Sequence, residues 1–229
     1  MREFILRARK APTSGAFSLD SLPKAGHMEV VASCISNAIF ISNQLRTDTT
    51  ISVVLEGGPE PPKTLRISGD NLGSLDGFDE RSIARTIQTS LEAGRGLELH
   101  ETRAVDRGIT IAKIAFEHLL QDRPPESLFY LDRRGQDIRH VDLPPDLTFV
   151  FSDYLSMPKK SGKYLARLGA TPISLGPKTL FASHCIVLVH NEMDRRANPC
   201  SAGRVRSAEF RMAHRYEACT LNSPSPQTL

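Results

Sequence analysis

Residues 171–194 read TPISLGPKTLFASHCIVLVHNEMD, and this stretch decides the fold. The apolar run over 172–175 predicts a buried strand, and the apolar residues over 180–193 predict a helix. Between them, Gly176 lets the backbone approach a ligand without a Cβ, and Pro177 stiffens the turn. Main-chain N–H and C=O groups freed there could pair with the edge of an adenine ring. The alternative is that the Gly-Pro pair only turns the chain into the helix.

Two more apolar runs, over 127–132 and 147–153, predict strands of the same kind, and a short helix is predicted over 161–169. Earlier in the chain, the pattern predicts a strand at 3–8, a helix at 28–45, a strand at 50–57 with a hairpin partner at 63–69, a helix at 79–94, a strand at 96–101, and a short strand with a helix over 108–122. Strands that alternate with helices predict an α/β fold, with a mostly parallel sheet covered on both faces.

The composition is that of a globular protein. Of 229 residues, 40% are apolar and 24% are charged. The length suits one sizeable domain or two small ones. No stretch approaches the roughly 20 apolar residues of a membrane helix, and the opening apolar run is too short for a signal peptide. We therefore expect a cytoplasmic protein with no membrane partner.

The chain has four cysteines, Cys34, Cys185, Cys200 and Cys219, and no Cys-x-x-Cys pair. This pattern favours neither a zinc site nor a disulfide framework. We expect Cys34 and Cys185 to be buried as small apolar side chains, and we expect no metal.

The net charge of +3 is unevenly distributed along the chain. Residues 195–229 carry six arginines and two glutamates, so residues 1–194 hold 23 basic and 24 acidic side chains. An argument for nucleic-acid binding by the folded part must therefore rest on local clusters. The candidates are Arg7, Arg9 and Lys10, then Arg133 and Arg134, then Lys159, Lys160 and Lys163. A solvated charged surface is the alternative for each cluster.

Common nucleotide and hydrolase fingerprints are missing from the sequence. It contains no G-x-G-x-x-G, no G-x-x-x-x-G-K-[ST], no H-E-x-x-H and no G-x-S-x-G. These absences argue against dinucleotide enzymes, P-loop enzymes, zinc peptidases and serine hydrolases of the usual kinds.

Several motifs in order resemble one family. The segment PISLGPKTLFASHCIVLVHNEMD is similar to the C-terminal signature of the archaeal tRNA pseudouridine-54 N1-methyltransferases, and MREFILRARKAPTSGAFSLDSLPKAGHMEVVASCISNAIFISNQLR resembles their N-terminus. LDGFDERSIARTIQTSL and FVFSDYLSM resemble internal parts of the same family. This family belongs to the SPOUT superfamily of S-adenosylmethionine-dependent RNA methyltransferases. The nearest relatives in chemistry are the ribosomal-RNA pseudouridine N1-methyltransferases, and a non-catalytic RNA-binding or assembly factor on the same fold is a further alternative.

The resemblance covers about residues 1–196 and implies a single SPOUT domain with a deep trefoil knot over 125–194. It also implies tRNA as a partner and a homodimer formed through the knot helices. By resemblance, S-adenosylmethionine lies among Leu131, Ser152, Asp153, Leu175, Gly176, Pro177, Lys178, Thr179, Leu180 and Cys185. The tail 197–229 is rich in Arg, Ser and Pro, departs from the family and is predicted to be disordered.

The implied dimer helix has an apolar face that suits an interface. Its residues are Ile186, Val187, Val189 and Met193, and burial within a monomer would look the same. His184 and His190 lie six residues apart in that helix, so they share no face and do not suggest a metal pair. A hydrogen-bonded histidine at the interface is the better interpretation.

The implied reaction needs a base, because N1 of pseudouridine carries a proton that must leave as the methyl group arrives. The candidate bases are Asp153, at the predicted end of a strand, and Asp20 in FSLDSLP. We favour Asp153, for which a helix N-cap is the alternative role. Cys185 is not expected to be a nucleophile, because nothing near it in the sequence suggests a thiolate.

Overall fold

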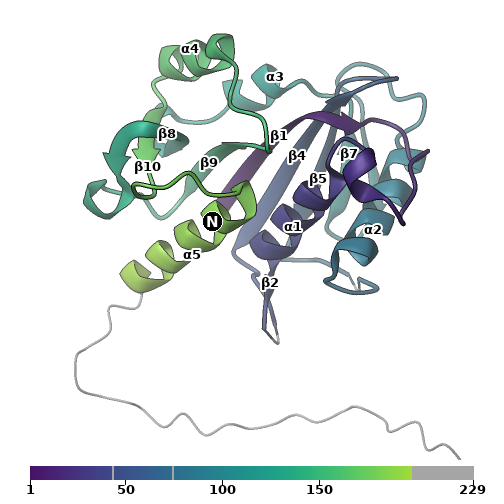
Figure 1. Ribbon diagram of the computed structural model, residues 1–229, viewed down its shortest axis with the longest axis horizontal. Coiled ribbons are helices and arrows are strands. Elements are labelled where there is room, and N and C mark those ends of the chain that lie inside the picture. The colour runs from purple at the N-terminus through teal and green to yellow at the C-terminus, as the bar shows by residue number, and fades with distance from the viewer. Residues whose placement is uncertain (43, 74, 198–229) are drawn as a thin grey trace, which may run out of the picture.

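The computed structural model describes residues 1–42, 44–73 and 75–197. Within these residues, one sheet has the strand order β10-β8-β9-β1-β4-β5-β7-β6 (Figure 1). A separate hairpin pairs β2 with β3. The strands are β1 (Arg2–Pro12), β2 (Phe40–Ile41), β3 (Gln44–Leu45), β4 (Thr49–Gly57), β5 (Lys63–Ser68), β6 (Thr102–Asp106), β7 (Ile109–Ala112), β8 (Leu128–Asp137), β9 (Leu147–Ser152) and β10 (Thr171–Ser174).

The neighbouring strands β10, β8, β9, β1 and β4 all run parallel. β5 pairs antiparallel with β4 as the predicted hairpin partner, and β7 and β6 continue antiparallel. The prediction of a mostly parallel α/β sheet is therefore confirmed. Because parallel strands end at the same edge, the loops after β8, β9 and β10 meet there. The trefoil knot expected over 125–194 stays a prediction.

Helices cover both faces of the sheet, as predicted. Phe4 and Leu6 of β1 join the core beneath α1, α2 and α5, while Ile5 points to the opposite core with Phe116 of α3 and Leu165 of α4. In Figure 1, α1 lies in front of the central strands. The helices are α1 (Met28–Ile39), α2 (Glu80–Ala93), α3 (Phe116–Gln121), α4 (Lys159–Arg167) and α5 (Ala182–Ala197), with short 3₁₀ turns η1 (Leu22–Lys24), η2 (Pro125–Ser127) and η3 (Ile138–His140). No helix within the described residues has the length and apolar character needed to cross a membrane.

Two predicted elements are wrong. The helix expected over 28–45 ends at Ile39, because Phe40 adopts an extended backbone with φ −94° and ψ 140° and opens the hairpin. The strand expected over 96–101 is a turn, and β6 begins only at Thr102. Gly96 and His100 have left-handed backbones with φ of 66° and 68°, which a strand cannot contain. The predicted disorder of the tail over 197–229 concerns residues that lie outside the described part of the chain after Ala197.

Helix α5 packs its main apolar face inside the molecule. Ile186, Val189 and Met193 are buried in the core that α5 shares with α1, and only Val187 of the expected interface residues is exposed. The monomer therefore accounts for most of the apolar face that suggested a dimer interface. Exposed apolar side chains elsewhere on and before α5 are Leu180, Phe181 and Leu188.

His190 connects α5 to two other elements. Its Nδ1 accepts a hydrogen bond from Nη1 of Arg2 at 3.1 Å, and its Nε2 lies 3.1 Å from the carbonyl oxygen of Ala38 in α1. Nearby, Asp194 pairs with Arg2 at 2.7 Å and with Arg46 at 2.8 Å. Burial, together with the charges of Arg46 and Arg2, lowers the pKa of His190 to about 3. The imidazole is therefore neutral, with its proton on Nε2 donated to Ala38.

We expect this buried histidine to make the protein sensitive to acid. The folded protein takes up the proton only near pH 3, whereas the unfolded chain takes it up near pH 6.5, so the free energy of unfolding falls as pH drops through this window. Urea unfolding between pH 4 and 7, with the wild type and His190→Gln compared, measures the slope. The variant should show a shallower fall, and parallel curves would contradict the assignment.

Arg7 holds the opposite face together. Its guanidinium pairs with Glu56 at 2.8 Å and Glu117 at 3.2 Å, donates to Ser161 Oγ at 2.6 Å and stacks 4.5 Å over the Phe116 ring. These contacts join β1 to β4, α3 and α4. The side chain is only 12% exposed, so the structure gives Arg7 a packing role, and its expected RNA contact stays a prediction.

Arg7→Met should lower the free energy of unfolding by about 1–2 kcal/mol, because it removes the guanidinium that Glu56 and Glu117 share while both carboxylates remain partly solvated. The matched control is Arg9→Met, two residues along the same strand, where the side chain is exposed. We expect the control to leave the stability within about 0.5 kcal/mol of wild type. Urea unfolding with unchanged m-values measures both. Equal stability of the two variants would refute the packing role.

Candidate active site

A cavity of about 710 Å³ opens where the loops after β8, β9 and β10 meet. Its wall contains every residue expected to hold the cofactor except Pro177: Leu131, Ser152, Leu175, Gly176, Lys178, Thr179, Leu180 and Cys185. Asp153 and Arg133 also line it. Segments that are 54 residues apart in the chain, from 131 to 185, thus share one hollow because their strands are neighbours in the sheet.

An irregularity in β8 shapes one wall of this cavity. β10 pairs with β8 through Pro172 and Tyr130, and then through Ile173 and Gln136, so the intervening residues 131–135 bulge from the ladder. The close backbone approach requires a glycine at position 135, where a Cβ would lie 2.5 Å from the nitrogen of Ile173. The bulge turns the segment that carries Leu131 and Arg133 toward the cavity.

The Gly-Pro turn forms another wall. Gly176 has φ of +128°, a backbone conformation that other residues rarely adopt, and no atom lies within 4 Å of where its Cβ would be. The amide nitrogen of Gly176 and the hydroxyl of Ser174 lie 3.3 Å apart. Leu131, Leu175 and Leu180 add apolar side chains to this wall. The wall therefore combines exposed main chain with an apolar surface, as small-molecule sites commonly do.

Asp153 brings a buried carboxylate to the cavity. Its side chain accepts a hydrogen bond from the Leu155 amide at 2.9 Å through Oδ1, while Oδ2 is buried with no hydrogen-bond partner among the described residues. Burial raises the pKa of Asp153, against the opposing effects of backbone hydrogen bonds from Leu155 and Arg9 and of the nearby positive charge of Arg9. It does not cap α4, whose N-cap is Pro158.

The alternative base, Asp20, lies elsewhere. It is exposed, pairs with Arg81 of α2 and does not belong to the cavity wall. A carboxylate that is solvated and already paired with a guanidinium is poorly suited to take a proton from a nucleobase bound in the cavity. The geometry therefore favours Asp153 over Asp20.

Sequence analysis did not single out Tyr154, which lines the cavity, or His27, which packs on Tyr154 from outside the cavity wall. Tyr154 lines the cavity directly after Asp153, and the imidazole of His27 packs on its ring with centroids 4.1 Å apart. His27 lies more than 120 residues away in the sequence, just before α1. Its only signal in the sequence was a Gly-His pair at the start of a helix.

The two buried cysteines are thiols without nucleophilic character. Burial raises the pKa of Cys34 far above its usual range and that of Cys185 to about 11. Both are free, as expected for Cys34 and Cys185, and Cys200 and Cys219 lie outside the described residues. His184 lines the cavity whereas His190 is buried against α1, and no metal-binding cluster occurs within the described part of the chain.

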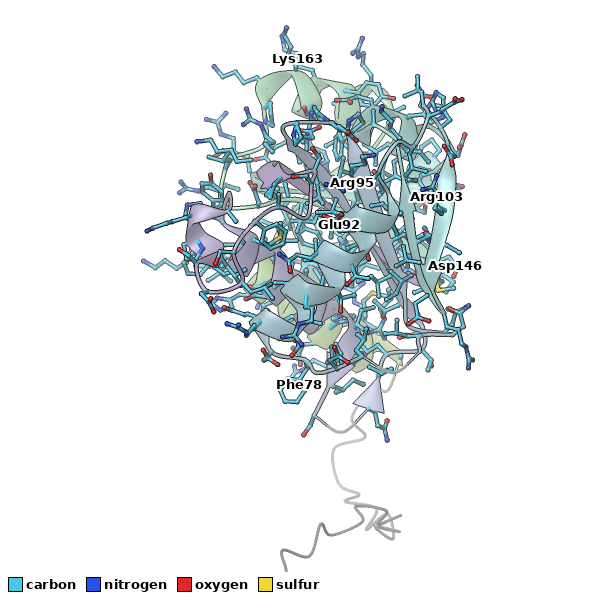
Figure 2. The ribbon with its side chains drawn as sticks, turned by 90° about the vertical axis from the view of Figure 1, so that its right-hand side faces the viewer. Phe78, Glu92, Arg95, Arg103, Asp146 and Lys163 are labelled. Atoms are coloured by element: carbon cyan, nitrogen blue, oxygen red, sulfur yellow. The ribbon has the colours of Figure 1, made fainter. Side chains whose placement is uncertain are left out.

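Of the predicted RNA-binding residues, Arg133 belongs to the cavity wall and the others lie outside it. Arg134 follows Arg133 on the exposed bulge of β8. Lys159, Lys160 and Lys163 are exposed on α4, and Figure 2 shows Lys163 projecting outward from that helix. Arg9 and Lys10 are exposed near the end of β1, and the charge of Arg9 reaches Asp153.

Comparisons with known proteins identify the family of the chain. A family model described as "Putative SAM-dependent RNA methyltransferase" matches residues 1–198. A Shewanella baltica protein named "Putative pseudouridine methyltransferase" is 41% identical over 195 residues, which is 85% of this chain and 98% of that protein. A Vibrio cholerae protein of the same name is 39% identical over 197 residues, which is 86% of this chain and 98% of that protein.

Among solved structures, Archaeoglobus fulgidus Nep1 bound to S-adenosylhomocysteine is similar with a TM-score of 0.56. The match covers 86% of this chain and 99% of that chain at 10% identity, so it shows a shared fold alone. The cavity volume and its mix of main chain and apolar wall fit an adenosyl cofactor. The family model spans nearly all of the described residues, and the chain belongs to this family of S-adenosylmethionine-dependent RNA methyltransferases.

Proposed function

We propose that this protein methylates N1 of pseudouridine at position 54 in the T-loop of tRNA. The names of its relatives support pseudouridine as the target. The resemblance of the segment over 172–194 to the archaeal tRNA enzymes supports the T-loop. The single observation that carries the proposal is an unpartnered buried carboxylate oxygen, Oδ2 of Asp153, in the wall of the cavity that the cofactor loops form.

Different residues of the cavity would bind the cofactor and accept the proton. When bound, S-adenosylmethionine supplies the methyl group as a sulfonium electrophile, and its sulfur leaves as a neutral thioether. The loop over 175–180 and Leu131 would hold it, and the main-chain groups around Gly176 would be available to its polar atoms. Asp153 takes the N1 proton as the bond between N1 and the methyl carbon forms. Proximity and orientation supply most of the acceleration, and the base adds a further factor.

The RNA backbone would lie across the exposed basic clusters beside the cavity. Arg133 and Arg134 on the β8 bulge and the lysines of α4 are exposed and carry no ion pair within the described residues. Their contact with phosphates would be independent of sequence and sensitive to salt. Arg9 and Lys10 extend the same proposal, whereas Arg7 is paired with its carboxylate partners.

A homodimer and a cytoplasmic location complete the proposal. The exposed apolar side chains Leu180, Phe181, Val187 and Leu188 on and before α5 support a second copy as partner. Phe181 and Leu180 also lie in the cavity wall, so a partner copy there would complete the site. A tRNA substrate supports a cytoplasmic location for the protein.

The proposed substrate is tested by methyl transfer from labelled cofactor to T-loop RNA with pseudouridine or uridine at position 54. We expect label only in the pseudouridine RNA, at N1, because the carbon-linked base alone has a free N1–H. A ribosomal-RNA hairpin with pseudouridine is the competing substrate. Preference for that hairpin would reassign the substrate. Cofactor binding by calorimetry without any methyl transfer would favour the non-catalytic RNA-binding alternative.

Asp153→Asn should lower kcat by about 10²-fold or more, because the amide keeps the hydrogen bond to Leu155 but accepts no proton. Asp20→Asn is the matched control and should retain wild-type kcat. Since burial raises the pKa of Asp153 and the base must be ionised, the wild-type rate should fall with acid at a higher pH than an ordinary aspartate would give. Single-turnover rates against pH measure both effects. Equal losses in the two variants would refute Asp153 as the base.

A further inference from the structure

The segment before α1 holds His27 in an unusual conformation. Gly26 and His27 both have left-handed backbones, with φ of 63° and 62°. At Gly26 the backbone passes so close to β1 that a Cβ would lie 2.0 Å from the carbonyl oxygen of Lys10. A left-handed backbone is uncommon for a histidine, and such strain gathers at functional sites. His27 occupies the N-cap position of α1, yet its side chain makes no capping hydrogen bond.

The side chain of His27 instead bonds to a carboxylate. Its Nδ1 lies 2.8 Å from Oε1 of Glu29, and because a carboxylate only accepts, the proton of the neutral imidazole belongs on Nδ1. Nε2 then carries a lone pair and has no hydrogen-bond partner within the described residues. An imidazole with one nitrogen held by a carboxylate and the other open has the arrangement of a proton acceptor.

The open imidazole packs on the segment that carries the proposed base. Its ring contacts Tyr154, the residue after Asp153, with centroids 4.1 Å apart. Asp153 is 9% exposed, whereas the His27 side chain is 43% exposed. The charged and titratable groups around His27 are Glu29 on α1, Asp153 and Tyr154 after β9, and Arg9 on β1. His27 is therefore a half-exposed imidazole packed against the residue that follows the buried carboxylate.

We propose that His27, oriented by Glu29, accepts the proton that Asp153 takes up during methyl transfer. The inference rests on the proposed function. The proton leaves N1 for Oδ2 of Asp153, passes to Nε2 of His27, and goes from the imidazolium to water, so that both groups return to their starting forms. Once RNA covers the cavity, water reaches Asp153 poorly, and the half-exposed imidazole offers the proton an exit. In this scheme His27 is a positioning residue for the proton, because it does not line the cavity itself.

The test uses His27→Asn and His27→Gly, since asparagine and glycine both tolerate a left-handed backbone. The matched control is His100→Asn, because His100 also has a left-handed backbone, packs on another histidine, and lies beside β6 at the opposite edge of the sheet. Each protein is assayed on a T-loop RNA and a ribosomal-RNA hairpin that carry pseudouridine. Thermal unfolding and calorimetry of S-adenosylmethionine binding accompany the kinetics.

Both His27 variants should lose roughly tenfold to a hundredfold in kcat with unchanged cofactor affinity, and the control should match wild type. Added imidazole should restore His27→Gly, more strongly as pH rises and imidazole becomes neutral. The pH–rate profile of His27→Asn should differ in shape from that of the wild type, because one proton-accepting group is lost. Glu29→Gln should give a smaller loss that imidazole does not restore.

Unchanged kcat and pH profile in the His27 variants would overturn the inference. A rise in KM for RNA with unchanged kcat would also overturn it, because His27 would then contact the bound nucleotide and accept no proton. These outcomes leave the proposed function intact, because the wild type still methylates pseudouridine. A wild type that methylates neither RNA would overturn both.

Discussion

The docking of α5 on α1 and the start of β1 is the constraint on which the site depends. The loop that forms one cavity wall leads directly into α5, so the helix fixes where Gly176 and Leu180 lie. Burial of Ile186 and Val189 contributes roughly 1.5–3 kcal/mol each. His190 fixes the orientation of α5 in this contact, because its two ring nitrogens must lie within hydrogen-bond distance of Arg2 and Ala38 at once. A neutral ring is required there, since a second cation beside Arg2 would be costly.

The central strand β1 carries charges that specify how its neighbours pack. Glu3 is 8% exposed and accepts from Arg66 at 2.9 Å, from Arg123 at 2.6 Å and from Thr148 at 3.1 Å. Burial opposes its ionisation, but the Arg123 and Arg66 partners prevail and lower the pKa of Glu3. Breaking such a pair costs more free energy than the pair itself contributes, because it leaves a buried charge without a partner. The charges at positions 2, 3 and 7 of the chain thus tie β1 to both faces of the sheet.

The cavity separates two environments that the reaction needs. Leucines and exposed main chain on the β8 and β10 loops suit a bulky, mostly apolar cofactor. A few residues away, Asp153, Tyr154 and His27 form a polar cluster in which one carboxylate is partly desolvated. Desolvation strengthens the carboxylate as a base, and a nearby half-exposed imidazole offers the proton a way out. Both environments arise from segments that meet only at the carboxyl ends of parallel strands.

The sequence by itself determined the fold class, the apolar strands and the Gly-Pro turn, because these depend on local patterning. The expected wall residues from Leu131 to Cys185 came from the resemblance of its motifs to one family. The sequence misjudged 28–45 and 96–101, where apolar spacing suited two structures and the backbone at Phe40 and His100 decided between them. It also did not show the packing role of Arg7, since charge in a sequence does not reveal a partner at positions 56 or 117. Only the tertiary structure brought His27 to Tyr154 and left Oδ2 of Asp153 without a partner, because such contacts join segments that are distant along the chain.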